Sequence, residues 1–561
     1  MVKRTDPASA IEPEMSSGLR CFVYGTAAIT GACVLIVEIL GAKMLSPYFG
    51  TSHFVWTAQI AITLLALAAG YYLGGRWVDR SPRLGNIYLA ILGASVYLAA
   101  TVLLVDDVSI ACQKMDLALG SLLASLFLFL VPLALLAMTG PFLVRILTKS
   151  VSQVGGNVGR LTSISTLGSV GGTVLIGYVL IPRLPNSVTM LATAGVLVLL
   201  PIVYFVVWGR DQRPTAGITA ALLLIACFAF AGLRPEWKSR IRYGGVEWIV
   251  RARANSNFGH MMVMDLNRYG AIDRYYLNDN LIQNTYDPVT GKSLSLFTEL
   301  LHGLPHAYTT NLQSVLCIGM GTGIVPMMLV RDEVEVDVVE INPGVVPLAE
   351  EWFGFKPKTL RHLKIGDGRY FLNHLQEQYD AIVLDAFLGD SSPSHLMTKE
   401  AFKAVRKRLT PAGVLVMNTF GRDLETVVLG YEVESAALFE EVKGVFLVFD
   451  RPDDDFYTAS LHKTLKAVFP HVRVHGSGNG NVFFVASMSP LKVHRPPAFD
   501  LTHKSLQESP DLTRRPQTAW DRVWRVSDEI GMVMTDDYNP IEYHDAAHRE
   551  STRKGLVAGL K

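Results

Sequence analysis

The first 232 residues of the chain contain a series of hydrophobic runs that are each long enough to cross a lipid bilayer. The hydrocarbon core of a bilayer is about 30 Å thick and takes about 20 apolar residues of a helix. All runs but the first lack Asp, Glu, Lys and Arg, as a membrane requires because a charge at its centre is costly. The runs lie at residues 22–44, 54–74, 85–105, 117–144, 161–182, 187–208 and 214–232. They predict seven membrane-spanning helices.

The composition agrees with a chain that lies partly in lipid. Of the 561 residues, 50% are hydrophobic and only 18% are charged, which is too apolar for an ordinary soluble enzyme. From Arg234 onward charged residues return at the density of globular proteins. The sequence therefore predicts an N-terminal cytoplasmic tail at 1–20, a transmembrane helical domain at 21–232, a linker at 233–244, a small β-region at 245–290, a Rossmann-like domain at 291–490 and a C-terminal extension at 491–561.

Charge and cysteine spacing exclude several classes of protein. A formal net charge of +1 gives no general attraction to nucleic acid. The five cysteines lie far apart, without a C-x-x-C pair, and so indicate neither a disulfide scaffold nor a structural zinc site. The histidines considered as ligands have no H-E-x-x-H or paired-carboxylate spacing, and the sequence predicts no metal cofactor. These histidines are His260, His302, His306 and His395.

Lys and Arg in the loops predict the orientation in the membrane, because positive loops favour the cytoplasm. One set of termini and loops carries Lys3, Arg4, Arg20, Arg76, Arg80, Arg83, Arg145, Lys149, Arg160, Arg210 and Arg213, and the other only Lys43, Lys114 and Arg183. The N-terminus is therefore expected in the cytoplasm. Seven crossings would place the second half outside, whereas the positive stretch 234–242 favours the cytoplasm. We expect a multi-pass protein of the inner membrane with a cytoplasmic catalytic domain, in which one run does not cross.

A glycine-rich turn between two β-rich runs indicates a nucleoside site. Residues 314–343 read SVLCIGMGTGIVPMMLVRDEVEVDVVEINP, in the strand–turn–helix–strand order of a nucleotide-binding sheet. Gly319, Gly321 and Gly323 allow a tight turn, and Glu340 ends the second strand, where a carboxylate accepts from both ribose hydroxyls. This spacing fits S-adenosylmethionine enzymes better than dinucleotide dehydrogenases, whose pattern is G-x-G-x-x-G. Glycines that only pack a corner between strand and helix would give the same spacing.

Further carboxylates follow the next strands of the predicted sheet. In HLKIGDGRYFL, Asp367 and Gly368 lie between a strand and a helix, and in YDAIVLDAFLGDSSP, Asp385 closes a buried strand with Asp390 five residues later. The carboxyl ends of parallel strands form the ligand crevice of such a sheet, so these residues are expected to converge with Glu340. A carboxylate there could accept a proton from an attacking amine.

At these residues the chain resembles the spermidine synthase (polyamine aminopropyltransferase) family, in particular its membrane-fused bacterial members. The resemblance covers about residues 245–490. It rests on the segments NDNLIQNTY, VEINPGVV, GDGRYFL and YDAIVLD. It implies nucleoside contacts at Gln283, Glu340 and Asp367 and a catalytic role for Asp385, with Asp390 as a second acid. The family transfers an aminopropyl group from decarboxylated S-adenosylmethionine to an amine and releases methylthioadenosine.

The chain departs from the family pattern at residues that, in the family, contact the propylamine end of the donor and the diamine acceptor. Thr322 stands where the family has an aspartate near the propylamine end of the donor, and Met320 replaces a glycine. The family's Tyr-His-Glu triplet is Phe297, Thr298 and Glu299 here, so the usual diamine pocket is not rebuilt. S-adenosylmethionine as co-substrate, and with it methyl transfer to a lipid or other hydrophobic acceptor, is the main alternative.

A third alternative is a polyamine or nucleoside transporter or sensor without turnover, in which Glu38 within the first run would be essential for uptake. The expected partners are a small-molecule amine or lipid-like acceptor and the bilayer, with no nucleic acid, and a homodimer is left open.

Overall fold

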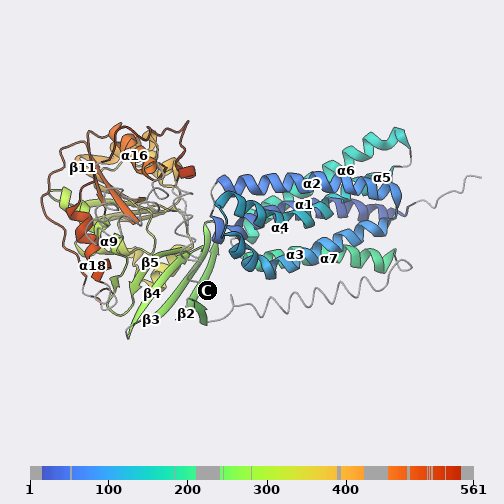
Figure 1. Ribbon diagram of the computed structural model, residues 1–561, viewed down its shortest axis with the longest axis horizontal. Helices are drawn as coiled ribbons and strands as arrows, with labels where there is room; N and C mark the ends of the chain where they lie inside the picture. Colours follow the sequence, from blue (N-terminus) through green and yellow to red (C-terminus); the bar gives the residue numbers. More distant parts are fainter. Residues whose placement is uncertain are drawn as a thin grey trace, which may run out of the picture. The chain divides into compact units, whose positions relative to one another are not determined.

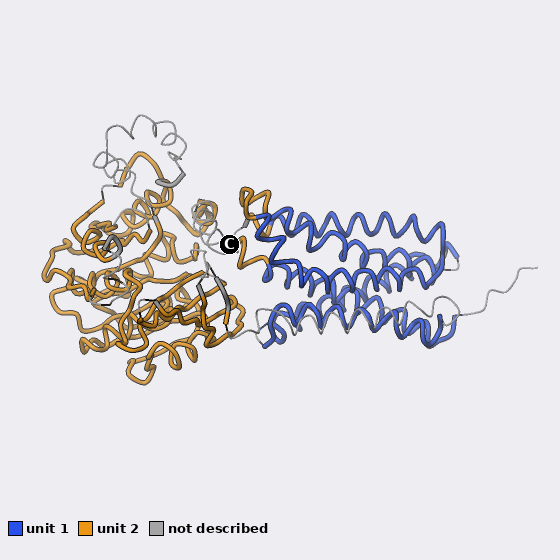
Figure 2. The backbone as a smooth tube through the Cα atoms, turned by 60° about the horizontal axis from the view of Figure 1, so that its bottom comes forward, with its two compact units in different colours: residues 1–44, 57–112, 121–234 blue, residues 45–56, 113–120, 235–561 orange. Residues whose placement is uncertain are grey.

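The computed structural model describes residues 15–50, 53–148, 150–181, 183–209, 240–243, 246–268, 270–279, 281–387, 393–421, 453–476, 480–501, 503, 506, 510–524 and 526–544. The predicted seventh run, 214–232, and the predicted acid Asp390 lie outside these residues. The chain divides into two compact units (Figure 2). Met1–Met44, Thr57–Cys112 and Ser121–Arg234 form the first unit, and Leu45–Trp56, Gln113–Gly120 and Pro235–Lys561 form the second.

The first unit consists of long apolar helices. They are α1 (Ser17–Phe49), α2 (His53–Arg80), α3 (Leu84–Cys112), α4 (Leu117–Ala137), α5 (Thr139–Leu147), α6 (Val154–Leu175) and α7 (Asn186–Val207), with short helical turns at Val151–Gln153 and Ile176–Leu180. In the described part of the chain, six helical segments are long and apolar enough to cross a membrane. These six segments confirm the helical prediction for the runs between residues 22 and 208.

Small residues bring α1 and α6 into close contact. A Cβ added at Gly172 of α6 would lie 2.6 Å from the carbonyl oxygen of Ala32, and one at Gly168 would overlap the carbonyl oxygen of Ala28. Ser169 on the same face donates a hydrogen bond to the carbonyl of Gly31, at 3.0 Å. Close backbone packing of this kind stabilises helix pairs where lipid provides no hydrophobic force between them.

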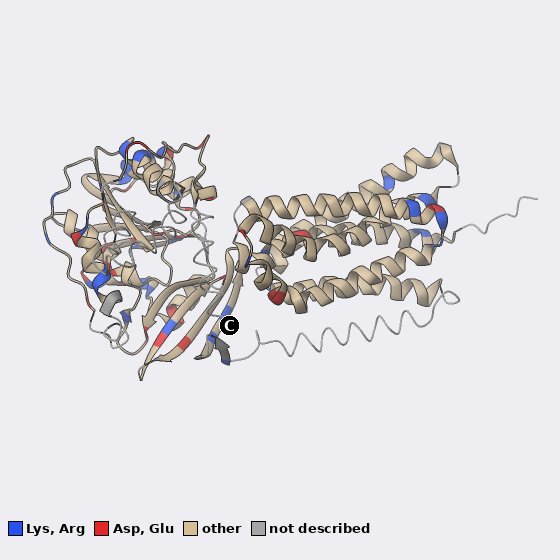
Figure 3. Cartoon of the chain, viewed as in Figure 1, with Lys and Arg blue, Asp and Glu red and all other residues tan. Residues whose placement is uncertain are grey.

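Positive side chains gather at one end of this helical unit. Figure 3 shows Lys and Arg concentrated where α2 and α5 end, and the last turns of these helices carry Arg80 and Arg145. This uneven distribution of Lys and Arg is the observation that predicts which end of the helices faces the cytoplasm.

The second unit begins with an antiparallel sheet in which every strand pairs with the next. Its strands are β1 (Arg240–Tyr243), β2 (Val246–Ser256), β3 (Gly259–Arg268), β4 (Ala271–Asn278), β5 (Leu281–Asp287) and β6 (Lys292–Ser293). Asp265 on β3 accepts charged hydrogen bonds from Arg251 and Arg274 on the two neighbouring strands, each at 2.7 Å. These cross-strand ion pairs help fix the register of the sheet.

A seven-stranded sheet forms the centre of the second unit. The strands are β7 (Ser314–Ile318), β8 (Glu335–Glu340), β9 (His362–Ile365), β10 (Tyr379–Leu384), β11 (Leu409–Gly421), β12 (His471–Gly476) and β13 (Gly480–Ser487), in the order β12-β13-β11-β10-β7-β8-β9. β9, β8, β7, β10 and β11 are parallel, whereas β13 is antiparallel to both β11 and β12. The chain thus proceeds from β7 to one edge and returns to continue from β10 toward the other edge.

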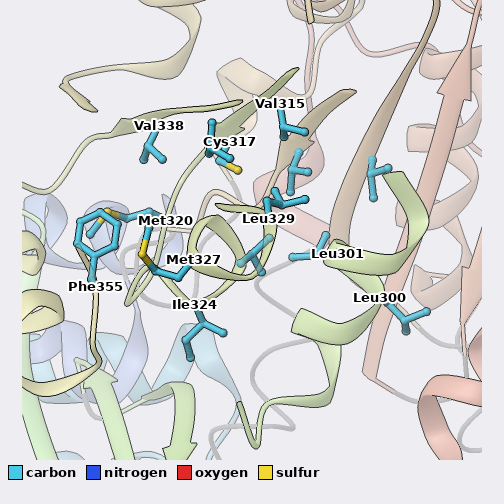
Figure 4. Packing of buried hydrophobic residues seen from close by; sticks show 14 of the residues in the cluster. Leu300, Leu301, Val315, Cys317, Met320, Ile324, Met327, Leu329, Val338 and Phe355 are labelled. Atoms are coloured by element: carbon cyan, nitrogen blue, oxygen red, sulfur yellow. The ribbon is translucent and has the colours of Figure 1, made fainter. Parts of the chain in front are cut away.

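Helices cover both faces of this sheet. They are α9 (Leu296–Tyr308), α10 (Ile324–Arg331), α11 (Val345–Trp352), α12 (Gly368–His374), α13 (Lys399–Arg408), α16 (Asp453–Lys466) and α18 (Pro510–Asp521) (Figure 1). Alternate residues of β7 belong to opposite cores: Val315 and Cys317 pack with α9 and α10, and Leu316 packs with α13 and α16. Figure 4 shows Cys317 among Leu301, Leu329 and other apolar residues of the first core. The predicted α/β domain behind a helical membrane-type unit is confirmed.

Candidate functional site

A cavity of about 370 Å³ opens at the carboxyl ends of the parallel strands. It lies where the strand order reverses between β7 and β10, the place at which sheets of this type bind ligands. Its lining includes residues that follow β7, β8, β9 and β10, together with side chains from β5. The predicted site residues among them are Gln283, Gly319, Gly321, Glu340, Asp367, Gly368 and Asp385. Gly323 is not among the described lining residues.

The glycine turn after β7 depends on backbone conformations that favour glycine. Gly319, Gly321 and Gly323 have φ angles of +83°, +53° and +79°. A Cβ at Gly319 would overlap the carbonyl oxygen of Asp385, and one at Gly321 would lie 2.6 Å from Asn284 Oδ1. Gly323 caps α10 and packs its backbone against the Phe355 ring. Two glycines thus shape the cavity wall, and the third positions the following helix.

Glu340 at the end of β8 braces this turn. The residue is only 7% exposed. Its Oε2 accepts a hydrogen bond from the backbone N–H of Met320 at 2.9 Å, and its Oε1 accepts one from the N–H of Asn342 at 2.7 Å. Burial raises the pKa of Glu340, while these backbone donors act in the opposite direction. A carboxylate has about four acceptor sites, so Glu340 keeps acceptor capacity for a ligand in the cavity.

Asp367 caps the helix that follows β9. Its Oδ1 accepts from the N–H of Tyr370 at 2.8 Å, and its Oδ2 lies 2.7 Å from Nε2 of His395, which also lines the cavity. Asp367 therefore has a structural role as an N-cap besides the adenine contact that the resemblance implies.

Asp385 follows β10, and its carboxylate is held by amides rather than by a cation. Oδ1 accepts from Nδ2 of Asn418 at 2.8 Å, and Oδ1 of Asn418 accepts from Nδ2 of Asn481 at 3.0 Å. Burial raises the pKa of Asp385 to about 6, and the hydrogen bond from Asn418 only partly opposes this shift. Asp385 is therefore mostly ionised at pH 7 and able to accept a proton.

Several lining residues were not predicted from the sequence. Asn418 and Asn481 come from β11 and β13, and aromatic rings complete the wall: Phe258, Tyr276, Phe297, Phe387 and Phe420. Asn284 lies next to the predicted Gln283 and accepts from the N–H of Thr322 at 3.2 Å. The NDNLIQNTY segment indicated this region, but strand alternation alone does not show which of two adjacent amides supports the turn.

Thr322, where the family has an acid, does not line the cavity. Its side chain is completely buried, and its hydroxyl has no hydrogen-bond partner among the described residues. The residue thus supplies no charge to a ligand, which agrees with the departure noted in the sequence.

The strand order, the glycine turn and the acid after β8 define the class of this domain: a Rossmann-like α/β domain of the S-adenosylmethionine-enzyme type. Within that class, residues 294–442 match the family model for the spermine/spermidine synthase domain.

Individual known proteins are similar to parts of the chain. Over 147 residues the chain is 38% identical to the polyamine aminopropyltransferase of Vibrio vulnificus, covering 25% of this chain and 47% of the relative. It is 27% identical over 241 residues to the human eEF1A lysine and N-terminal methyltransferase, covering 39% and 33% of the two chains. The spermidine synthase structure from Thermotoga maritima aligns with 46% of this chain and 82% of its own, at 18% identity and a TM-score of 0.32. The chain spans about half, or less, of these two curated relatives' length.

Proposed function

We propose that the protein is a membrane-anchored aminopropyltransferase that uses decarboxylated S-adenosylmethionine as donor and an amine, such as a polyamine, as acceptor. The family match at residues 294–442 supports the transferase class. The similarity to an enzyme named polyamine aminopropyltransferase supports the transferred group.

The charge of the cavity is the observation that carries the choice of donor. Glu340, Asp367 and Asp385 all line it, and none of its described lining residues is Lys or Arg. Decarboxylated S-adenosylmethionine is a sulfonium with an ammonium tail, so both of its charges are attracted to carboxylates. The carboxylate of S-adenosylmethionine itself would meet like charges without a cationic side chain to balance them.

In the proposed reaction the amine nitrogen attacks the methylene carbon next to the sulfonium. A C–N bond forms and the C–S bond breaks, and its electron pair remains on sulfur, so that methylthioadenosine leaves. Before this attack the ionised Asp385 would hold the incoming ammonium, because amines are mostly protonated at neutral pH, and would accept one of its protons, which frees the lone pair of the nitrogen. The nitrogen keeps its remaining protons after the attack, so the product leaves as a secondary ammonium.

Methyl transfer is the second candidate, and it has its own support. The chain is 27% identical over 241 residues to a protein methyltransferase, and Thr322 offers no charge to a propylamine tail. In this reaction the acceptor would be lipid-like or otherwise hydrophobic, and the product would be S-adenosylhomocysteine.

Product analysis distinguishes the two reactions. The full chain, purified in lipid nanodiscs, is incubated with each donor and a panel of amines and lipids. We expect methylthioadenosine only from the decarboxylated donor and only with an amine present. Formation of S-adenosylhomocysteine would establish methyl transfer instead, and binding of both donors without either product would contradict an enzymatic role.

We further propose that the helical unit anchors the protein in the inner membrane with the transferase domain on the cytoplasmic side. The six apolar helical segments support membrane insertion. An even number of crossings returns the chain to the side on which it began, where positive loops favour the cytoplasm.

A further inference from the structure

Two histidines and an aspartate converge on the surface of the second unit, outside the cavity described above. His302 and His306 lie four residues apart on α9 and therefore project from the same face of the helix. Asp332 follows the last residue of α10 and approaches both rings. Nε2 of His302 lies 2.8 Å from Oδ2 of Asp332, and Nε2 of His306 lies 3.1 Å from the same oxygen.

The environment of His306 is not that of a simple ion pair. Its Nε2 is buried and has no hydrogen-bond partner among the described residues, although Asp332 Oδ2 is close. The nitrogen is thus near the carboxylate but out of line for a hydrogen bond. A buried ring nitrogen without a partner is unfavourable. The nitrogen would gain a partner if its lone pair, Nε2 of His302 and Oδ2 of Asp332 all bound one metal ion.

The distances fit a tetrahedral transition-metal ion. Ligand atoms about 2.1 Å from a metal at tetrahedral angles lie about 3.4 Å from one another. The three ligand atoms here lie within 4.8 Å of one another, and two of their separations are 2.8 and 3.1 Å. The third separation, between the two imidazole nitrogens, exceeds the tetrahedral value of about 3.4 Å by at most about 1.4 Å. Rotation of these partly exposed side chains would bring all three atoms to bonding distance. Two imidazoles and one carboxylate are a ligand set that suits Zn²⁺ and neighbouring divalent transition metals rather than Mg²⁺ or Ca²⁺.

We propose that His302, His306 and Asp332 form a binding site for a divalent transition-metal ion, with Zn²⁺ as the reference ion. The ion clips α9 to the C-terminal end of α10, the helix that Gly323 of the glycine turn begins. Three protein ligands leave a fourth position for water. The carboxylate of Asp332 is 45% exposed, and His302 also borders a second cavity of about 160 Å³, so water and exchanging metal have access.

Metal titration of the full chain without a polyhistidine tag tests this site. After treatment with a chelator, we expect the protein to bind one equivalent of Zn²⁺ by calorimetry. Co²⁺ is expected to give the visible absorption of a tetrahedral complex with nitrogen and oxygen ligands. Saturating Zn²⁺ should raise the melting temperature by several degrees, because it binds only the folded state. Mg²⁺ and Ca²⁺ should not compete.

Variants separate this site from adventitious binding. The double variant His302→Ala/His306→Ala is expected to lose at least about 100-fold in affinity, and Asp332→Asn, which keeps the shape, about tenfold or more. His374→Ala removes an exposed histidine on α12 and serves as the matched control with unchanged binding. Two results would overturn the proposal. One is an unchanged Zn²⁺ stoichiometry in both the double variant and Asp332→Asn. The other is a wild-type protein that binds no Zn²⁺ at about 100-micromolar concentrations. Asp332→Asn covers the case in which the double variant fails to fold.

Discussion

The carboxylate of Asp385 lines the cavity without a cationic partner among the described residues. Asn418 donates a hydrogen bond to it, and Asn481 in turn donates one to Asn418. This environment keeps the side chain in place and leaves its charge available to a cation in the cavity. It also explains why burial raises its pKa to about 6. A catalytic base needs this combination, whereas a purely structural carboxylate is usually paired.

Asp385→Asn is expected to abolish most of the turnover and leave donor binding nearly intact. The amide keeps the acceptor oxygen for Asn418 but can neither hold the ammonium nor accept its proton, a loss of about a hundredfold to ten-thousandfold in rate. Single-turnover rates and donor affinity are measured on the same variant. The wild-type rate should also decline below about pH 6, as Asp385 becomes protonated, and the variant should lack that decline. Near-normal rates in the variant would eliminate the catalytic role.

The same substitution is expected to stabilise the protein above pH 6. Burial raises the pKa of Asp385 from 3.8 to about 6, so the folded state binds the proton more tightly than the unfolded state. The stabilisation from this proton is complete below pH 4 and is lost as the pH rises through about 6. Asp385→Asn should therefore melt at a higher temperature than the wild type at pH 7.5 and at the same temperature near pH 4. Asp528→Asn, at an exposed position, is the control; equal melting at both pH values for Asp385→Asn would contradict the assigned environment.

Glu340→Gln tests the nucleoside site. One oxygen of Glu340 accepts from Met320 N–H and the other from Asn342 N–H, so a glutamine must direct its NH₂ group at one of these donors. We expect the affinity for methylthioadenosine to decrease by roughly tenfold or more, from the loss of charge-assisted hydrogen bonds and the disturbed turn. Calorimetric titration measures it, with Glu350→Gln on the exposed side of α11 as control. Unchanged affinity in Glu340→Gln would remove this residue from the site.

At the scale of elements, the contact between α1 and α6 depends on particular glycines. Gly168 lies against the backbone of α1, whereas a Cβ at Gly171 would have nothing within 4 Å. Gly168→Leu should separate the two helices and lower the melting temperature in detergent by several degrees, while Gly171→Leu on the open face should not. Equal melting temperatures for the two variants would mean that the contact contributes little to stability.

The elements were largely predictable from the sequence, and their side-chain contacts were not. Hydrophobic runs, uncharged in all but the first, predicted the six helical segments, because lipid permits few other sequences. The positions of Glu340, Asp367 and Asp385 at strand ends predicted their convergence, since parallel strands share one edge. Asn418 on β11 and Asn481 on β13 could not be predicted, because no local motif shows that their amides reach the cavity. Asp332 was missed as a partner of His302 and His306, because the three meet only when α9 packs beside α10.

At the scale of the whole molecule, the chain joins a Rossmann-like α/β domain to a helical unit with the length and composition of a membrane domain. The two parts follow different physical rules. The helices expose apolar side chains such as Leu167 and Val170 of α6, at 71% and 56%, which lipid tolerates and water does not. The sheet of the second unit has apolar cores on both faces, as a domain in water requires. In a membrane, the number of helices that cross would determine on which side the α/β domain lies.

Labelling of introduced cysteines in intact cells tests the proposed cytoplasmic placement of the α/β domain. If each of the six described apolar segments crosses the membrane, the chain returns to its starting side. Nucleoside donors are made in the cytoplasm, so Asp528→Cys should then be protected from an impermeant maleimide. Arg83→Cys, between α2 and α3, should be protected in the same way, and Lys114→Cys, between α3 and α4, should be labelled. Both controls are exposed positions, so accessibility of the side chain is matched, and the unsubstituted chain measures the background of its own thiols. If Asp528→Cys were labelled like Lys114→Cys, residues 214–232 would have to cross as a seventh span. The donor would then need to reach the cavity from outside the cell membrane.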